Sequence, residues 1–400
     1  MGGGLMQLVA YGAQDVFLTG NPQISFFKVV YRRHTNFAME SIEQTFNGNP
    51  ELGNRVTCTI SRNGDLVTNM WLEVDFENNF EDSKPVNSLG HSLIEYITLE
   101  IGGQQIDKHY GEWLEIWSEL TMPEEKRNGF KEMIGRRDAG VAYSPESNKL
   151  YIPLQFFFCR NPGLALPLIA LQYHEVKVNI KFRSASELSR DSSTSVKFRT
   201  NPRLYVDYIY LDTEERRRFA QSQHEYLIEQ LQHTGPESTK DDNHRLNFNH
   251  PVKELIWVTR KSGSDPMEFG NVDHSANYFA EDALTGSVEM PATYDSFTKC
   301  KLQLNGHDRF SERDASYFRL VQPYQHHTRV PSKYIYLYSF AINPESHQPS
   351  GTCNFSRLDN VTLTLTDLKN KATDGELLVY AVSNNILRIM SGMGGLAYSN

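Results

Sequence analysis

The chain has 400 residues, of which 39% are hydrophobic and 22% are charged. These proportions are ordinary for a globular protein with one or two cores. Its net charge of −9 excludes the strongly basic surface that is typical of nucleic-acid-binding proteins. The four cysteines stand far apart and form no Cys-x-x-Cys pair. This spacing predicts neither a disulfide framework nor a zinc site, and we expect no metal and no cofactor.

Residues 1–24 are predicted to form an N-terminal arm, because the segment opens with three glycines and its apolar residues keep no lasting period. The basic residues that follow are interleaved with aromatic ones, a composition that can bind single-stranded nucleic acid or dock against an acidic neighbour or a lipid headgroup. Docking is favoured because the rest of the chain is acidic, and we expect no direct nucleic-acid binding. The candidate contact residues are Leu5, Leu8, Val9, Tyr11, Phe17, Lys28, Arg32 and Arg33.

From about residue 38 the chain is predicted to form short strands. Apolar and polar residues alternate over 70–77, which indicates a strand with one buried face. Asn63-Gly64 precedes this strand and predicts a hairpin turn. The first half is predicted to hold eight strands, at 38–46, 56–61, 70–77, 94–101, 150–157, 166–171, 175–183 and 204–211.

One helix is predicted among these strands. Trp113, Ile116, Trp117 and Leu120 stand at i, i+3, i+4 and i+7, the spacing of an apolar helical face packed on a sheet. We therefore expect a helix over 110–120, with both tryptophans in the core rather than in a ligand platform. Thr121-x-x-Glu124 resembles a capping box and predicts a second short helix after the first.

The second half repeats this order of elements. The strand, Gly turn, short helix, strand and Asn-Pro loop of the first half return in the same order about 180 to 205 residues later, with helix candidate 315–321 and the alternating strand at 361–366. A repeat of this length predicts two similar domains. The fold class is therefore all-β, with two tandem eight-stranded antiparallel jelly rolls and short helices in loops. The expected division is an arm over 1–24, a first roll over 25–213 and a second roll over 214–400.

Motifs for chemistry are largely missing. His326 and His327 are neighbours, and on a strand they would point to opposite faces, so they are not expected to share a metal ion. We find no nucleophile elbow and no phosphate-binding loop in the sequence. A pair of glycosidase carboxylates could converge in space without leaving a signature. The tripeptides at Asn354 and Asn360 match the glycosylation pattern, but chance is the favoured explanation because no secretory signal accompanies them.

Several segments resemble one viral family across the whole chain. The segments are Gly4–Asp15 with Leu18–Gln23, Tyr31–Arg33, Ser61–Leu66, Leu150–Leu154 with Asn161–Gly163, Asn354–Asn360 and Tyr380–Arg388. They are similar to the major capsid proteins of chlorella viruses and other nucleocytoplasmic large DNA viruses.

The resemblance implies a structural, non-enzymatic late protein with a double jelly roll. It implies homotrimeric, pseudo-hexagonal capsomers of an icosahedral shell over an internal membrane, assembled in the host cytoplasm. The expected partners are further copies of the chain, neighbouring capsomers, minor capsid and vertex proteins, and the viral membrane. The arm residues would then serve the inner face of the shell. The alternatives from the fold are a jelly-roll carbohydrate-binding attachment protein and a cupin-type metalloenzyme.

Overall fold

The computed structural model describes residues 2–77, 86–136, 148–189, 196–261, 265–269, 295–368 and 375–398. The chain divides into two compact units, Met1–Asn36 and Phe37–Asn400. The first unit holds two short helices, α1 (Gly3–Val9) and α2 (Val16–Thr19), and neither of them buries a residue. The predicted arm ended at residue 24, whereas the second unit begins at Phe37.

The first half of the second unit forms two antiparallel sheets that enclose one hydrophobic core. We name each sheet after one of its central strands. The β9 sheet has the order β1 (Phe37–Gln44), β9 (Phe198–Leu211), β3 (Leu66–Phe76) and β6 (Lys149–Pro153), with β7 (Leu166–Pro167) beside β3. The β8 sheet has the order β2 (Arg55–Thr59), β8 (Val176–Phe182), β4 (Ile94–Ile101) and β5 (Gln104–Tyr110).

The second half repeats this plan with two further antiparallel sheets. The β20 sheet has the order β10 (His224–His233), β20 (Gly375–Met390), β13 (Pro251–Lys261) and β17 (Tyr336–Ser339), with β11 (Glu237–Ser238), β18 (Cys353–Asn354) and β21 (Met393–Leu396) at its sides. The β19 sheet has the order β12 (Asn243–Arg245), β19 (Val361–Thr366), β14 (Lys299–Leu304) and β15 (His307–Asp308), with β16 (Arg313–Asp314) beside β14. Strand by strand, the orders match those of the first half, which confirms two tandem jelly rolls.

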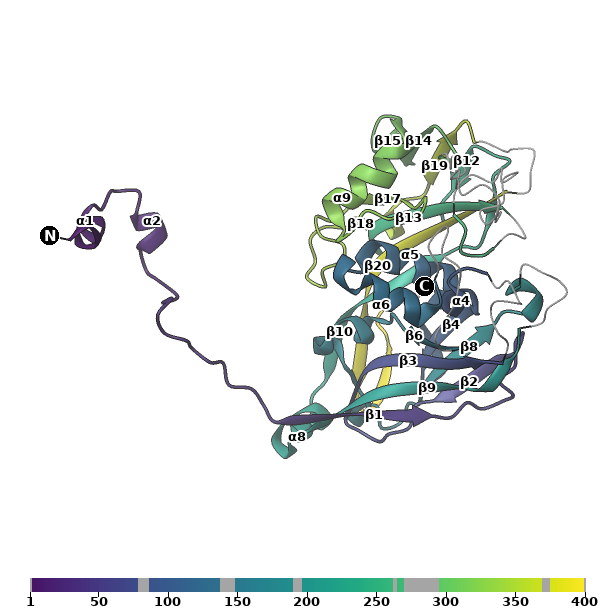
Figure 1. Ribbon diagram of the computed structural model, residues 1–400, viewed down its shortest axis with the longest axis horizontal. Coiled ribbons are helices and arrows are strands. Elements are labelled where there is room, and N and C mark those ends of the chain that lie inside the picture. The colour runs from purple at the N-terminus through teal and green to yellow at the C-terminus, as the bar shows by residue number, and fades with distance from the viewer. Residues whose placement is uncertain are drawn as a thin grey trace, which may run out of the picture. The chain divides into compact units, whose positions relative to one another are not determined.

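Short helices fill the connections between strands. The α-helices of the second unit are α4 (Leu89–Ser92), α5 (Gly111–Thr121), α6 (Glu124–Ile134), α7 (Phe157–Arg160), α8 (Thr213–Gln221) and α9 (Gln322–His326). Tighter or wider turns occur at η1 (Pro162–Leu164), η2 (Leu168–Ala170), η3 (Ala185–Glu187), η4 (Tyr317–Val321) and η5 (Phe355–Arg357). Figure 1 shows α5 between the strands of the first half and those of the second.

Three sequence predictions about strands were wrong. Strand β5 was missed because its buried residues include Asp107 and His109, so no apolar alternation marks it. The run 166–171 was taken for a strand, but only Leu166 and Pro167 pair with β3 before the chain turns into η2. A proline cannot donate to a ladder, and the run is apolar because it is buried as a loop. The strand predicted at 150–157 ends at Pro153 and is followed by α7.

The two predicted helices of the first half exist, but the predicted capping box does not. Helix α5 runs over Gly111–Thr121, close to the predicted range. Thr121 donates a 2.8 Å hydrogen bond to the carbonyl oxygen of Trp117, so it belongs to the end of α5. Helix α6 starts after Pro123, with no side-chain cap. In the second half the helix candidate 315–321 is the wide turn η4, which continues into α9.

Candidate functional site

Helix α5 joins the two jelly rolls through its apolar face. Its four predicted stripe residues are all buried in a cluster with the outward-facing residues of the β20 sheet. The rings of Trp113 and Tyr380 lie 5.6 Å apart between centroids. Helix α5 follows the β4–β5 hairpin of the first roll, yet it covers a sheet of the second. The cluster consists of Trp113, Ile116, Trp117, Leu120, Ile256, Val258, Phe269, Ile335, Leu337, Leu378, Tyr380 and Val382.

Gly111 allows α5 to start close to the first roll. A Cβ atom at this position would lie 2.3 Å from the carbonyl oxygens of both His91 and Ile94. No other residue fits without moving that backbone. The glycine thus holds the start of α5 against α4 and β4, while the remaining turns extend over the second roll.

The other face of α5 carries three buried glutamates at i, i+3 and i+7. Oε1 of Glu115 accepts a 2.6 Å hydrogen bond from Lys333 Nζ, and Oε2 of Glu115 lies 2.6 Å from His91 Nδ1. Burial by itself would raise the pKa of Glu115, but Lys333, His91 and Arg136 outweigh burial and hold the pKa well below its usual range. Glu115 is therefore ionised at neutral pH, with its charge balanced by a lysine of the second half.

The flanking glutamates connect the halves in the same way. Glu119 accepts hydrogen bonds from Arg136 of the first half and, at 2.9 Å, from the backbone N–H of Ser332 of the second. It also forms an ion pair at 2.7 Å with Arg329 of the second half. Burial opposes ionisation, but the two guanidinium groups lower the pKa of Glu119 to about 2. Glu112 lies 2.7 Å from Arg183 of the first half and 2.6 Å from Arg260 of the second.

A second contact joins the edge strands β5 and β10. Asp107 Oδ1 accepts a 3.1 Å hydrogen bond from the backbone N–H of Leu231, and Gln230 donates to the carbonyl oxygen of Ile106. His109 lies 2.9 Å from the other oxygen of Asp107. The sequence analysis predicted neither these residues nor the glutamates of α5. The glutamates could have been noticed as a row of acidic residues on the helix face opposite the tryptophan stripe.

His326 and His327 do not lie on a strand. His326 ends α9, and His327 follows it with a fully buried imidazole. His327 Nε2 lies 2.8 Å from Glu254, and Nδ1 lies 2.8 Å from Glu345. Burial alone would lower the pKa of His327, but the two carboxylates outweigh burial and raise it to about 9. His327 is therefore a cation inside the second roll.

Alkaline pH is expected to weaken the second roll through His327. The pKa of its imidazole in the folded chain is above the ordinary 6.5, so its contribution is fully present below pH 6.5 and is lost as the pH rises through 9. From pH 6.5 to 9.5 the wild type should lose roughly 3 kcal/mol more stability than a His327→Gln variant. Urea denaturation of both proteins at a series of pH values measures this difference, and parallel curves would contradict it.

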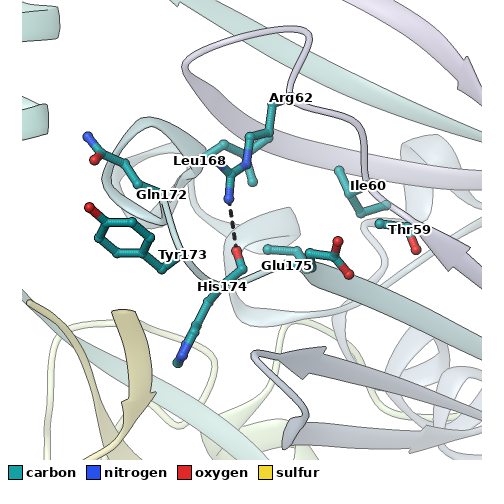
Figure 2. A pocket seen from close by; sticks show the side chains of 9 residues that line it. Thr59, Ile60, Arg62, Leu168, Gln172, Tyr173, His174 and Glu175 are labelled. Atoms are coloured by element: carbon teal, nitrogen blue, oxygen red, sulfur yellow. Dashed lines mark hydrogen bonds between the residues drawn. The ribbon is translucent and has the colours of Figure 1, made fainter. Parts of the chain in front are cut away.

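A hollow of about 390 Å³ lies beside loop 171–175 of the first roll, and this loop contacts β21. Arg62 donates hydrogen bonds to the carbonyl oxygens of Leu171 and, at 3.2 Å, of His174 (Figure 2). His174 Nδ1 lies 3.1 Å from the backbone nitrogen of Gly394. The side chains of Arg62 and His174 therefore stabilise the backbone of the loops around the hollow, and this arrangement is structural rather than catalytic. The lining residues are Thr59, Ile60, Arg62, Leu168, Gln172, Tyr173, His174, Glu175 and Val176.

The predicted arm residues are all in the first unit and all exposed. Leu5, Leu8 and Val9 lie on α1 and Phe17 lies on α2, and Phe17 is 91% exposed. Tyr11, Lys28, Arg32 and Arg33 lie outside helices and are exposed as well. Taken by itself, the first unit leaves the large apolar side chains of the arm exposed.

The two glycosylation patterns occupy the second roll. Asn354 is exposed and precedes η5, where its side chain accepts a 3.0 Å hydrogen bond from the backbone N–H of Ser356. Asn360 is exposed before β19. Their glycosylation stays a prediction.

Among the residues that the structure describes, no group of three or more His, Cys, Asp or Glu side chains could hold a metal ion. In the same ranges no helix is long and apolar enough to cross a membrane. The buried glutamates of α5 pair with cations of both rolls.

Comparisons with known proteins agree with this architecture. The family model "Major capsid protein N-terminus" matches residues 25–212, and the model "Large eukaryotic DNA virus major capsid protein" matches residues 215–395. The major capsid protein of Pyramimonas orientalis virus is 53% identical, with all of both chains covered. That of Paramecium bursaria Chlorella virus 1 is 44% identical, again over all of both chains.

Solved structures give the same result. A quasi-atomic model of the PBCV-1 virus capsid contains a chain that is 40% identical, with a TM-score of 0.77, covering 94% of this chain and all of that one. The Faustovirus major capsid protein has a TM-score of 0.76 at 13% identity, over 95% of this chain and 94% of that one, which shows the shared fold.

Two matching jelly rolls, joined by a buried helix and its ion pairs, define a double jelly-roll capsid subunit, a structural protein and not an enzyme. The chain belongs to the family of major capsid proteins of large eukaryotic DNA viruses.

Proposed function

We propose that three copies of this chain form a pseudo-hexagonal capsomer of an icosahedral shell. The observation that carries the proposal is the identical strand order of the two rolls. Three chains with two similar rolls each supply six similar lobes, an outline that can tile a flat facet. A closed ring also uses head-to-tail contacts without growing into a filament. In this proposal the rolls span 25–213 and 214–400, and the partners are neighbouring capsomers and minor capsid and vertex proteins, assembled in the host cytoplasm.

The purified protein is expected to be a trimer of about 138 kDa, three times the 45.9 kDa chain. Its subunit interfaces should bury more than about 2,000 Å² in total, as obligate assemblies do. Light scattering coupled to size-exclusion chromatography measures the mass across micromolar concentrations. A monomer at every concentration would overturn the proposal, and a monomer that binds a defined glycan would favour the attachment protein instead.

The proposed role of the arm is to contact partners on the inner side of the shell. Its exposed apolar residues need a partner surface, because ordering a free segment costs roughly 1–2 kcal/mol per residue in backbone entropy. The partner is the underside of the trimer, a minor capsid protein or the internal membrane. Lys28, Arg32 and Arg33 favour an acidic or anionic one.

Deleting residues 2–24 is expected to leave trimers of normal mass and normal melting temperature that fail to form shells. The assay is co-expression with the other capsid components, followed by electron microscopy. A matched variant keeps the arm's length and replaces Leu5, Leu8, Val9 and Phe17 by serine, and it should fail in the same way. Normal shells from both variants would refute the role, whereas loss of the trimer would assign the arm to the capsomer itself.

A further inference from the structure

The two rolls share a helix at the same position in their topology. In the first roll, α5 follows the β4–β5 hairpin. In the second roll, the continuous segment η4–α9 (residues 317–326) follows the corresponding β14–β15 hairpin and the short strand β16. The β9 sheet and the β20 sheet also correspond, strand for strand. A contact made by α5 on the β20 sheet therefore has a counterpart in η4–α9 and the β9 sheet.

Among the described residues, the chain makes the contact between α5 and the β20 sheet but not the contact between η4–α9 and the β9 sheet. Helix α5 covers the outer face of the β20 sheet, where alternate residues such as Ile256, Leu378 and Tyr380 are buried against it. Their neighbours along the strands, such as Trp257 and Val379, face the core of the second roll. The β20 sheet is thus covered on both faces.

The counterpart segment η4–α9 carries exposed apolar side chains on its outward face. Phe318, Gln322 and Pro323 are buried on the side toward the second roll. Leu320, Val321 and Tyr324 point away from it and are exposed, Tyr324 to 80%. These three apolar side chains on one short helical segment form a surface that the rest of the described chain leaves exposed.

The counterpart sheet also carries partly exposed aromatic side chains on its outer face. Trp71 and Tyr205 pair across β3 and β9, and their rings stack at 5.8 Å between centroids. Tyr151 lies beside them on β6, opposite Glu73, and is 37% exposed. On its other side, Glu73 lies opposite Arg203 in the register of β3 with β9. Protein–protein interfaces typically have aromatic side chains at their centre and charged or polar side chains at their rim, as this face does.

We propose that Leu320, Val321 and Tyr324 of one copy dock on Trp71, Tyr205 and Tyr151 of the next copy. The occupant is a second copy of this chain, because these surfaces correspond to the pair that already forms the α5 contact within the chain. The described part of the chain leaves these helix residues exposed, so a second copy can cover them. The contact is head-to-tail and repeats the joint between the two rolls, so that three chains close a ring. The inference rests on the proposed trimer and names the surfaces that hold it together.

Cross-linking tests which surfaces meet. A double variant, Tyr324→Cys with Tyr151→Cys, is treated with a bismaleimide and run on a denaturing gel. Covalent dimers and trimers are expected from the double variant and not from either single variant. The wild type is the control for the native cysteines, of which Cys58 and Cys300 are buried. Cross-linking of the Tyr324→Cys single variant alone would place helix against helix and overturn the inference.

Charge substitution gives a second readout. Replacing Leu320 and Tyr324 by aspartate should raise the protein concentration at which trimers dissociate by about thirty-fold or more. The circular dichroism spectrum should not change, because both side chains are exposed. Tyr173→Asp, at a residue that is 75% exposed elsewhere on the chain, should leave the trimer intact.

The two proposals fail in different ways. A wild type of trimeric mass whose double-cysteine variant does not cross-link would overturn the surfaces and leave the trimer standing. A wild type of monomeric mass would overturn the trimer and the surfaces together.

Discussion

Replacing Trp117 by alanine is expected to lower the free energy of unfolding by about 3–5 kcal/mol. Only 5% of Trp117 is exposed, and its ring packs in the α5 cluster with the guanidinium of Arg160 4.7 Å from its centroid. The substitution removes apolar contacts that join the first roll to the β20 sheet, and it leaves a cavity that the two rolls cannot close without shifting. The effect should therefore reach both rolls.

Urea denaturation followed by far-ultraviolet circular dichroism measures this loss at a fixed protein concentration, because unfolding of an oligomer depends on concentration. Tyr173→Ala is the matched control, since that aromatic residue is largely exposed, and its effect should stay within about 0.5 kcal/mol. A loss below about 1 kcal/mol for Trp117→Ala would mean that the helix does not depend on this packing.

Replacing Glu115 by alanine is expected to cost about 3–5 kcal/mol, the usual cost of leaving a buried partner charge uncompensated. Its carboxylate is fully buried and lies 2.6 Å from Lys333 and 3.6 Å from Arg136. Without Glu115, Lys333 loses the carboxylate that lies 2.6 Å from its ammonium group and keeps a 2.9 Å hydrogen bond to the carbonyl oxygen of Met267. Glu125→Ala removes an exposed glutamate of α6 and should change stability by less than about 0.5 kcal/mol.

A double variant separates charge pairing from packing. Glu115→Leu with Lys333→Met removes both charges and keeps most of the volume, so it should cost less than the sum of the two single substitutions. Strictly additive losses would show that Glu115 and Lys333 do not interact across the rolls. Equilibrium unfolding of the four proteins supplies the complete cycle.

Several features of this chain could be predicted from local sequence. The alternation over 70–77 predicts β3, and the same period over 361–366 predicts β19, because successive side chains on a strand face opposite sides. The stripe from Trp113 to Leu120 predicts α5, because residues three and four apart share one helical face. The return of these elements in the second half predicts the tandem rolls and, through the family resemblance, the capsid function.

Other features depend on residues that meet only in the folded chain. Strand β5 has no apolar alternation, because Asp107 and His109 are buried as a pair. His327 is a cation because Glu254 and Glu345 reach it from separate segments. The stripe on α5 indicated that the helix is buried, but the sheet it covers belongs to the second roll. Glu115 and Lys333 are 218 positions apart, and no local period links them. The sequence by itself determined each strand and helix whose own side-chain period has one buried face; the tertiary structure decided which elements cover one another, because charge pairing and close packing between distant segments exist only after the rolls have folded.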